Sequence, residues 1–238
     1  MSHTPMRSAH IPVTDPSAGL RLTEIFYSLQ GEANDSGWPT VFVRLTGCPL
    51  RCVYCDTTYS FEGGQRHSLQ DILNTVQEYG VRHVCVTGGE PLAQPNCIPL
   101  LHMLCDAGLT VSLETSGALD VSAVDARVSK IVDLKTPSSG EQARNLLTNL
   151  DHLTPHDQIK FVIMNRTDYD WSRDMLRQYA LSERVSTVWF SPAFAVEKHQ
   201  VKLPALAREL ADWIVADRLP VRFQLQLHKL LWQDEAGR

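Results

Sequence analysis

The sequence predicts an α/β protein built on a partial, open (β/α)6-type barrel. Segments rich in β-branched and aromatic residues alternate with amphipathic helical segments, which indicates parallel strands joined by right-handed crossovers. About six strands follow a cysteine-rich loop, fewer than the eight of a complete barrel. Residues with chemical functions also recur where these strands end, and ligands bind at that edge of parallel sheets.

The elements are expected in the following order. Strands are predicted at residues 20–27, 40–46, 83–87, 109–114, 130–135, 158–164, 185–191 and 221–225, each short and rich in strand-forming residues. Helices are predicted between them at residues 68–79, 98–107, 141–150, 169–180 and 203–217. Ser68 is a plausible helix N-cap with Asp71 three residues later, and Gly80 and Gly108 mark two helix ends.

The composition is that of one globular domain in a reducing compartment. The chain has 238 residues, of which 43% are hydrophobic, and a net charge of −5, so no basic field indicates a nucleic-acid or membrane partner. Residues 1–19 contain three prolines and no apolar signal segment, so we expect a mobile tail followed by one domain at residues 20–238. Free thiols near a metal motif indicate the cytoplasm.

Three of the six cysteines form a CxxxCxxC motif, and this motif predicts an open metal centre. Cys48, Cys52 and Cys55 supply three soft ligands, whereas a structural zinc site normally closes with four. A [4Fe-4S] cluster held by three thiolates has one iron free for another ligand. A zinc site completed by Cys85, Cys97 or Cys105 and a disulfide framework are the weaker alternatives.

A second motif, Thr87-Gly88-Gly89-Glu90-Pro91, follows an apolar strand segment. Glycines allow backbone to approach a ligand closely, and a carboxylate can accept hydrogen bonds from an ammonium group. Together with the cysteine motif, this segment resembles the radical S-adenosylmethionine (SAM) superfamily, whose cluster binds SAM at its fourth iron. The resemblance implies the superfamily's partial barrel, a [4Fe-4S] cluster and SAM as cofactors.

Further motifs narrow the resemblance. The segment Leu29-Gln30-Gly31-Glu32, the run from Arg44 to Cys48 and the sequence Cys55-Asp56-Thr57 resemble the 7-carboxy-7-deazaguanine synthase family, with weaker support from the Gln-Leu-His-Lys segment at 226–229. This resemblance covers the chain from about residue 20 to residue 229. It implies a carbon–nitrogen lyase that converts 6-carboxy-5,6,7,8-tetrahydropterin to 7-carboxy-7-deazaguanine with loss of ammonia, in queuosine and deazapurine biosynthesis.

The resemblance assigns roles residue by residue. Cys48, Cys52 and Cys55 are the implied cluster ligands, and Thr57 is the implied Mg²⁺ ligand. The implied SAM-lining residues are Tyr54, Gly89, Glu114, Ser116 and Lys135. The implied substrate-binding residues are Leu29, Gln30, Gly31, Arg44 and Thr87. Asp133 and Leu134 depart from the family's Ser-Pro before Lys135, and Ala33 stands where a glycine often occurs. Gln226 and His228 are candidates for pterin contacts.

The chemistry of these residue types agrees with such roles. Arg44 offers a planar fork for the substrate carboxylate, and Gln30 can pair with a pterin amide edge by donating and accepting. Mg²⁺ takes one or two protein oxygens, so the Thr57 hydroxyl beside a substrate carboxylate is an adequate site. Taken alone, Arg44 would more often be a surface ion pair and Thr57 a loop cap.

Two other functions are open. A glycyl-radical-enzyme activase, which acts on a protein, also contains CxxxCxxC, but those proteins usually have His-Asn after the third cysteine where this chain has Asp56-Thr57. A non-enzymatic zinc or iron–sulfur module would not need pocket residues on successive strand ends. The family resemblance also implies a homodimer and a reducing electron donor such as a flavodoxin.

Overall fold

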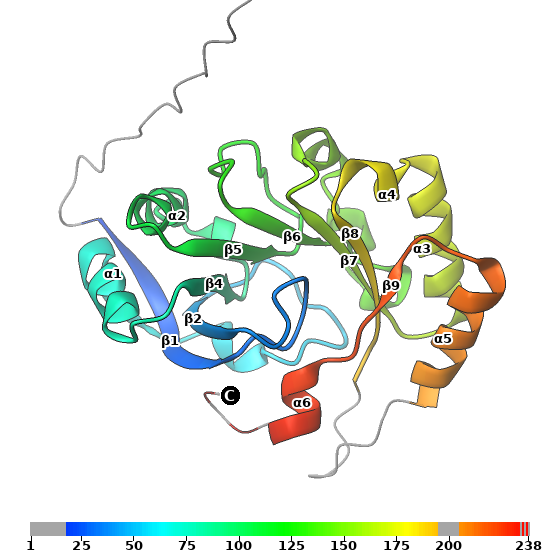
Figure 1. The fold of residues 1–238 in the computed structure, drawn as a ribbon, viewed down its shortest axis with the longest axis horizontal. Coiled ribbons are helices and arrows are strands. Elements are labelled where there is room, and N and C mark those ends of the chain that lie inside the picture. The colour runs from blue at the N-terminus through cyan, green and yellow to red at the C-terminus, as the bar shows by residue number, and fades with distance from the viewer. Residues whose placement is uncertain (1–17, 195–204, 234, 236, 238) are drawn as a thin grey trace, which may run out of the picture.

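One nine-stranded sheet organises the chain in the computed structural model, which describes residues 18–194, 205–233, 235 and 237. The strand order is β3-β1-β2-β4-β5-β6-β7-β8-β9. Most of the predicted tail, residues 1–17, lies outside the described residues, and β1 begins at Gly19. The sheet curls into an incomplete barrel, with α1 to α5 outside it and α6 at the open side (Figure 1).

The bounds of the elements are as follows. The strands are β1 (Gly19–Leu29), β2 (Pro39–Leu45), β3 (Gln65–Ser68), β4 (His83–Gly88), β5 (Thr110–Thr115), β6 (Ser129–Asp133), β7 (Gln158–Ile163), β8 (Thr187–Pro192) and β9 (Arg222–Phe223). The α-helices are α1 (Leu69–Glu78), α2 (Cys97–Asp106), α3 (Arg166–Gln178), α4 (Leu181–Arg184), α5 (Ala205–Asp217) and α6 (Leu227–Trp232). The short 3-10 turns of the described residues are η1 (Thr58–Ser60), η2 (Pro91–Ala93), η3 (Pro137–Ser139), η4 (Gln142–Arg144) and η5 (Leu147–His152).

The parallel part of the sheet confirms the predicted fold class. Strands β2 and β4 through β9 pair in parallel, so six parallel strands follow the cysteine loop, as expected. Strand β1 instead runs antiparallel to both β2 and β3, and β3 forms that edge of the sheet. The carboxyl ends of β2 and β4 to β9 therefore meet at one edge, where the predicted site residues lie.

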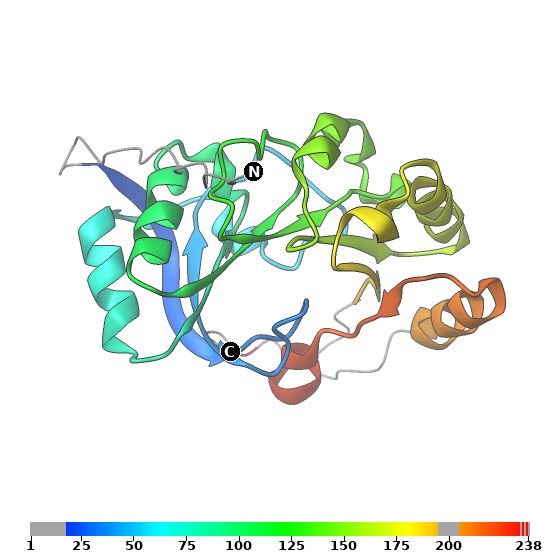
Figure 2. The same cartoon turned by 45° about the horizontal axis from the view of Figure 1, so that its top comes forward.

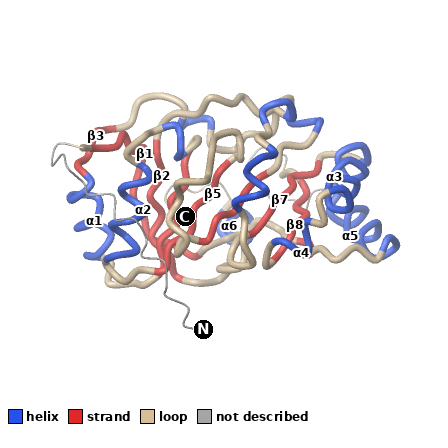
Figure 3. The backbone as a smooth tube through the Cα atoms, turned by 90° about the horizontal axis from the view of Figure 1, so that it is seen from above, coloured by secondary structure: helices blue, strands red, loops and turns tan. Residues whose placement is uncertain are grey.

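Two apolar clusters form the core. One joins β1, β2, β4 and β5 to α1 and α2, with side chains such as Leu20, Ile72 and Leu101 fully buried. The other joins β6, β7 and β8 to α3, α4 and α5 around Phe161 and Phe190. Figure 3 shows these two groups of helices on opposite flanks of the strands. Burying both clusters fixes the strands whose ends form the site.

Several predicted helix ends are confirmed. The Ser68 hydroxyl accepts a hydrogen bond from the Asp71 backbone N–H at 3.1 Å, which caps α1. Gly80 and Gly108 follow α1 and α2 with positive φ angles of 66° and 79°. Helix α3 begins earlier than expected, because Asn165 caps it by accepting from the Asp168 N–H at 3.1 Å.

The helix predicted at residues 141–150 is wrong, because the turns η4 and η5 occupy this segment. Side-chain amides explain the difference. Asn145 accepts from the Lys135 N–H at 2.8 Å and donates to the Lys135 carbonyl at 2.9 Å. Asn149 donates to the carbonyls of Gly117 and Leu119. These contacts anchor the segment to the ends of β5 and β6, and they override its helix propensity.

Helix α4, strand β3 and helix α6 were not predicted, and strand β9 is shorter than expected. Strand β3 contains only four residues, and Arg66 and His67 interrupt its strand-forming character. Helix α6 is six residues long, too short for a periodic pattern. Strand β9 pairs with β8 through only two residues, Arg222 and Phe223, instead of five. These short elements all lie near the edges of the sheet.

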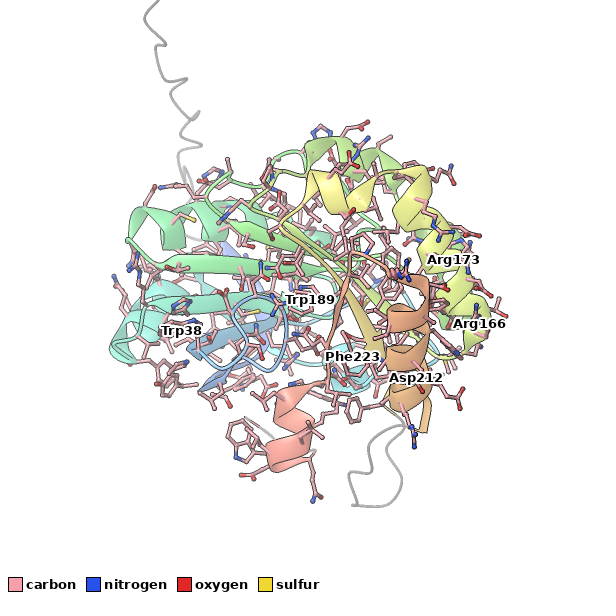
Figure 4. The ribbon with its side chains drawn as sticks, turned by 45° about the vertical axis from the view of Figure 1, so that its right-hand side comes forward. Trp38, Arg166, Arg173, Trp189, Asp212 and Phe223 are labelled. Carbon is pink, nitrogen blue, oxygen red and sulfur yellow. The ribbon has the colours of Figure 1, made fainter. Side chains whose placement is uncertain are left out.

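Helices α3 and α5 pack together far from the loop that carries Trp38 (Figure 4). The Arg166 guanidinium stacks 4.9 Å from the Tyr169 ring centroid and 5.1 Å from that of Trp213. The Tyr169 hydroxyl lies 2.9 Å from the Trp213 carbonyl and 2.8 Å from an Asp217 carboxylate oxygen. No helix in the described ranges is both long and apolar enough to cross a lipid bilayer.

Candidate active site

A pocket opens at the carboxyl ends of the parallel strands, where the sequence predicted the site. Thirteen of the fourteen predicted site residues line it: Leu29, Gln30, Arg44, Cys48, Cys52, Tyr54, Cys55, Thr57, Thr87, Gly89, Glu114, Ser116 and Lys135. The other, Gly31, lies just behind the lining. A Cβ atom at this position would be 2.1 Å from Nδ1 of His228, which itself lines the pocket. The individual roles of these residues remain predictions.

The glycine-rich segment packs directly on the cysteine loop. The N–H groups of Gly89 and Glu90 donate to the carbonyls of Leu45 and Gly47 at 3.1 and 2.9 Å. A Cβ at Gly89 would lie 2.2 Å from the Gly47 carbonyl oxygen, and one at Gly88 would lie 2.2 Å from that of Leu45. Only glycine fits this backbone contact, so the two motifs form one wall of the pocket.

The cysteine loop has a defined shape. Arg51 folds over it, donating to the carbonyls of Cys48 and Leu50 at 2.8 and 2.7 Å, and stacks 4.3 Å from the Phe61 ring centroid. Burial raises the pKa of Cys48, and it raises that of Cys52 to about 11. Both side chains are therefore neutral thiols until a metal centre displaces their protons.

The donor set fits a [4Fe-4S] cluster better than a four-thiolate zinc site. The other cysteines are buried elsewhere: Cys85 lies within β4, and Cys97 and Cys105 pack in the core on α2. Across the described ranges, no three His, Cys, Asp or Glu side chains are arranged to hold a single metal ion. The thiols of Cys48, Cys52 and Cys55 instead surround part of one pocket beside the glycine wall.

Glu90 has a structural role, which corrects the expectation that its carboxylate is free for an ammonium group. The side chain is fully buried. Its oxygens accept from the Ser116 N–H and hydroxyl at 2.7 and 2.5 Å, from the Thr115 hydroxyl at 2.9 Å and from the Leu92 N–H at 3.0 Å. Glu90 thus joins the ends of β4 and β5, and it fixes the Ser116 hydroxyl at the pocket.

Unpartnered polar atoms lie on the wall formed by the cysteine loop and β6. The Tyr54 hydroxyl and one Asp133 carboxylate oxygen are buried without a hydrogen-bond partner. The other Asp133 oxygen pairs with the Lys135 ammonium at 2.9 Å, and that ammonium lies 5.8 Å from the Tyr54 ring centroid. Burial lowers the pKa of Lys135, but the Asp133 carboxylate outweighs this effect, so the side chain stays charged.

Gln30, Thr87 and Glu114 form a hydrogen-bonded group at the pocket floor. The Glu114 carboxylate accepts from the Thr87 hydroxyl at 3.0 Å and from the Gln30 amide at 3.4 Å. Burial, with repulsion from Glu32, raises the pKa of Glu114. Glu114 was expected at a SAM-lining position, but its contacts place it with two predicted substrate residues.

Arg44 combines an ion pair with a free hydrogen-bonding edge. Its Nε donates to Glu24 at 2.7 Å, and the guanidinium lies between the rings of Phe26 and Tyr59, 5.5 and 5.8 Å from their centroids. Within the described part of the chain, the recorded hydrogen bonds of Arg44 use Nε alone. Both terminal nitrogens are available to a bound anion, as a two-point contact requires.

Thr57 does not cap the turn that it precedes. It occupies the N-cap position of η1, but its side chain makes no capping hydrogen bond there. The Thr57 hydroxyl lies 3.7 Å from the Cys55 sulfur and faces the pocket. The simpler interpretation of Thr57 as a loop cap therefore loses its support, and the hydroxyl is available to a ligand.

Sequence reasoning missed the Lys160–Glu32 ion pair in the pocket. Lys160 projects from the middle of β7 and pairs with the Glu32 carboxylate. The pairing with Lys160, although opposed by burial, lowers the pKa of Glu32. The sequence did contain a signal for Lys160. It alternates with Gln158 and Val162, so these three residues share one face of β7, and Lys160 is the charged residue on that face.

The start of α6 ties the pocket floor to the cysteine loop. The Gln226 amide donates to Glu32 at 2.7 Å and to Asp56 at 3.3 Å, and the Lys229 ammonium pairs with Asp56 at 3.0 Å. Figure 2 shows α6 beside the loop that follows β1, where the Leu227 N–H donates to the Gly31 carbonyl. Lys229 lowers the pKa of Asp56 to about 2, although burial of the Asp56 carboxylate opposes this shift.

The Asp56–Lys229 pair predicts a pH-dependent contribution to stability. Because the folded-state pKa of about 2 is below the ordinary value of 3.8, Asp56 stabilises the fold above pH 4, and this contribution is lost as the pH falls toward 2. Asp56→Asn should therefore reduce the free energy of urea unfolding much more at pH 6 than at pH 2.5, where the contribution of the ion pair is already partly lost. An equal reduction at both pH values would contradict the ion-pair assignment.

Comparisons with known proteins agree with this site. Residues 42–183 match the family model of the radical SAM superfamily. The chain is 43% identical over 222 residues to the 7-carboxy-7-deazaguanine synthase of Koribacter versatilis, covering 91% of this chain and 98% of the relative. It is 41% identical to that of Chlorobaculum tepidum, covering 92% and 97%. The crystal structure of QueE from Escherichia coli has the same fold, with a TM-score of 0.71 at 24% identity, covering 88% and 95%.

These matches decide between the three functions that the sequence left open: the synthase, the activase and the non-enzymatic metal module. The relatives extend over almost the whole chain and share one enzyme name, which supports neither a glycyl-radical-enzyme activase nor a non-enzymatic metal module. The matched family model contains the cysteine and glycine motifs that meet in the pocket. The chain belongs to the 7-carboxy-7-deazaguanine synthase family of the radical SAM superfamily.

Proposed function

We propose that this enzyme converts 6-carboxy-5,6,7,8-tetrahydropterin to 7-carboxy-7-deazaguanine, with release of ammonia, in deazapurine biosynthesis. One observation carries the proposal: a single pocket contains the CxxxCxxC thiols, the Arg44 fork and the Gln30–Glu114 group. A cluster-bound SAM and a flat, hydrogen-bonding anion would then lie close enough to react.

The three loop thiolates would hold a [4Fe-4S] cluster, which would supply the electron that cleaves SAM when both are bound. Tyr54, Gly89, Ser116 and Lys135 contribute the SAM side of the pocket. The unpartnered Tyr54 hydroxyl and Asp133 oxygen offer hydrogen bonds there to a polar ligand.

The opposite side of the pocket suits the pterin. Arg44 directs two unused N–H donors to its carboxylate, while Gln30 and Glu114 face its donor and acceptor edge. Leu29 and Phe26 add apolar surface for the ring. Gly31 permits the approach of His228, a candidate pterin contact together with Gln226.

Mg²⁺ is proposed to join Thr57 to the substrate. A hydroxyl with no capping role faces the pocket, and Mg²⁺ completes its coordination mainly with water and substrate oxygens. The ion would fix the orientation of the carboxylate during ring contraction.

The partners and setting are also proposed. A reducing electron donor such as a flavodoxin would supply electrons to the cluster, and the enzyme would act as a homodimer. An oxygen-sensitive site would need a reducing compartment such as the cytoplasm.

Anaerobic incubation of the reconstituted enzyme with SAM, reductant and the pterin tests the function. Mass detection of 7-carboxy-7-deazaguanine supports it, whereas SAM cleavage without this product would contradict it.

Loss of one loop thiol should abolish the chemistry. Anaerobically reconstituted wild type is expected to bind about four irons per chain, because three thiolates suffice for a cluster with one open iron. Cys52→Ala should lose SAM cleavage, whereas Cys105→Ala, which changes a core cysteine on α2, should retain it. Iron analysis and 5′-deoxyadenosine detection provide the measurements. One tightly bound zinc in the wild type would disprove the open-cluster assignment.

Arg44→Lys should separate substrate binding from SAM cleavage. Lysine can keep the ion pair with Glu24 but cannot make a two-point contact with a carboxylate. Pterin affinity should fall about 10- to 100-fold, which corresponds to the loss of one charged hydrogen bond. The cluster spectrum and the slow SAM cleavage without pterin should not change. Equal damage to both activities would assign Arg44 to structure.

Thr57→Val should uncouple SAM cleavage from product formation. The variant keeps the shape of the side chain but loses the proposed Mg²⁺ ligand, so the yield of deazaguanine per 5′-deoxyadenosine should fall by roughly 10- to 100-fold. Withdrawing Mg²⁺ from the wild type should reproduce the loss, and added Mg²⁺ should not rescue the variant. An unchanged product ratio would rule out a role for the hydroxyl.

A further inference from the structure

The loop after β1 is attached to the starts of β7 and β8, and it carries part of the pocket floor. Its residues 30–38 begin with Gln30, whose carbonyl accepts from the Gly37 N–H at 2.8 Å, and end at Trp38, whose carbonyl accepts from the Gln30 N–H at 2.9 Å. Gln30 and Glu32 point into the pocket from this loop. We call residues 30–38 the floor loop.

The floor loop has one unfavourable backbone conformation. Ala33 has a φ angle of 62°, in the left-handed region where glycine is preferred, and its side chain is buried. Ala33 directly follows Glu32, so its conformation sets the path of the loop on the carboxyl side of Glu32. An alanine will stay in this conformation only if the surroundings hold it there.

Gln224 provides that restraint. Its side-chain amide oxygen accepts from the Ala33 N–H at 2.8 Å, and its amide nitrogen lies 3.4 Å from the Ala33 carbonyl. The Gln224 side chain is 7% exposed, and its own N–H donates to the Phe190 carbonyl at 3.1 Å, which extends the β8–β9 pairing. Both sides of this contact are therefore buried, and Gln224 is itself anchored to the sheet.

The neighbouring contacts restrain other atoms, except that the Ser36 N–H also donates to the Ala33 carbonyl at 3.3 Å, so the Ala33 N–H is the group that Gln224 alone holds among the described residues. The Asn34 N–H donates to the Gln158 side chain at 2.8 Å, and the Asn34 amide bonds to the hydroxyls of Ser186 and Thr187. These bonds attach the loop to the starts of β7 and β8. Only Gln224 contacts both backbone polar groups of Ala33 among the recorded side-chain hydrogen bonds of the described residues.

We propose that Gln224 is a positioning residue for substrate binding, which holds Ala33 left-handed so that Gln30 and Glu32 keep their places in the pocket floor. Gln30 depends on this geometry because its amide oxygen accepts from the Glu32 N–H at 3.2 Å. Glu32 depends on it for its contacts with Lys160 and Gln226. This inference rests on the proposed function for its substrate and extends it to a residue outside the pocket lining.

The test compares Gln224→Met with the same change in an Ala33→Gly background. Methionine preserves the length and volume of the side chain but removes both hydrogen bonds, while glycine removes the strain that they offset. In reconstituted enzyme, Gln224→Met should speed amide hydrogen exchange at residues 32–34 and weaken pterin binding in the presence of SAM, each by about tenfold. Iron content and SAM affinity should stay at wild-type levels.

Ala33→Gly alone should bind the pterin as the wild type does, and it should recover most of the affinity lost in Gln224→Met. Tyr169→Phe is the matched control, because it removes partly buried hydrogen bonds to Trp213 and Asp217 on the remote α3–α5 flank. It should lower the unfolding midpoint without changing floor-loop exchange or pterin affinity.

Three outcomes would overturn the inference. The first is wild-type floor-loop exchange in Gln224→Met, and the second is unchanged pterin affinity in that variant. The third is failure of Ala33→Gly to recover the lost affinity, since Gln224 would then act by another route. A wild type that does not bind the pterin would instead refute the proposed function, and the exchange measurement would still decide whether Gln224 restrains the floor loop.

Discussion

The parallel pairing of β2 with β4 is the constraint on which the site depends. Its register places Leu45 opposite Gly88, so the cysteine loop and the glycine-rich segment leave the sheet side by side. The absence of side chains at Gly88 and Gly89 then lets the two backbones touch. A larger residue at either position would move the thiols away from the strand ends that carry the remaining pocket residues.

Charge balance is the second requirement of this pocket. Its lining contains carboxylates from three directions, among them Glu32, Glu114 and Asp133, and an anionic substrate would be repelled if they stood alone. Lys160 and Lys135 pair with Glu32 and Asp133, and the raised pKa of Glu114 favours its neutral form. Arg44 is thereby left as the cation whose terminal nitrogens can receive the substrate carboxylate.

The sequence predicted features that depend on local pattern and missed those that depend on tertiary contacts. The strand ends and the Ser68 cap follow from short motifs, so they could be placed without the structure. The helix expected at 141–150 failed because Asn145 and its neighbours bond to distant loops. Lys160 and Gln224 were missed for a related reason: each acts on the floor loop, more than 120 residues away in sequence, and no spacing rule connects them.

The most direct test of the account is hydrogen transfer within the pocket. If SAM and the pterin bind side by side, the hydrogen at C6 of the pterin should move to the deoxyadenosyl group during turnover. Mass spectrometry of 5′-deoxyadenosine formed from pterin deuterated at C6 measures this transfer. We predict 5′-deoxyadenosine heavier by one mass unit; because the conversion loses only ammonia and is redox-neutral, a hydrogen must then return from this group to the rearranged radical. Unlabelled 5′-deoxyadenosine during active product formation would contradict the shared pocket.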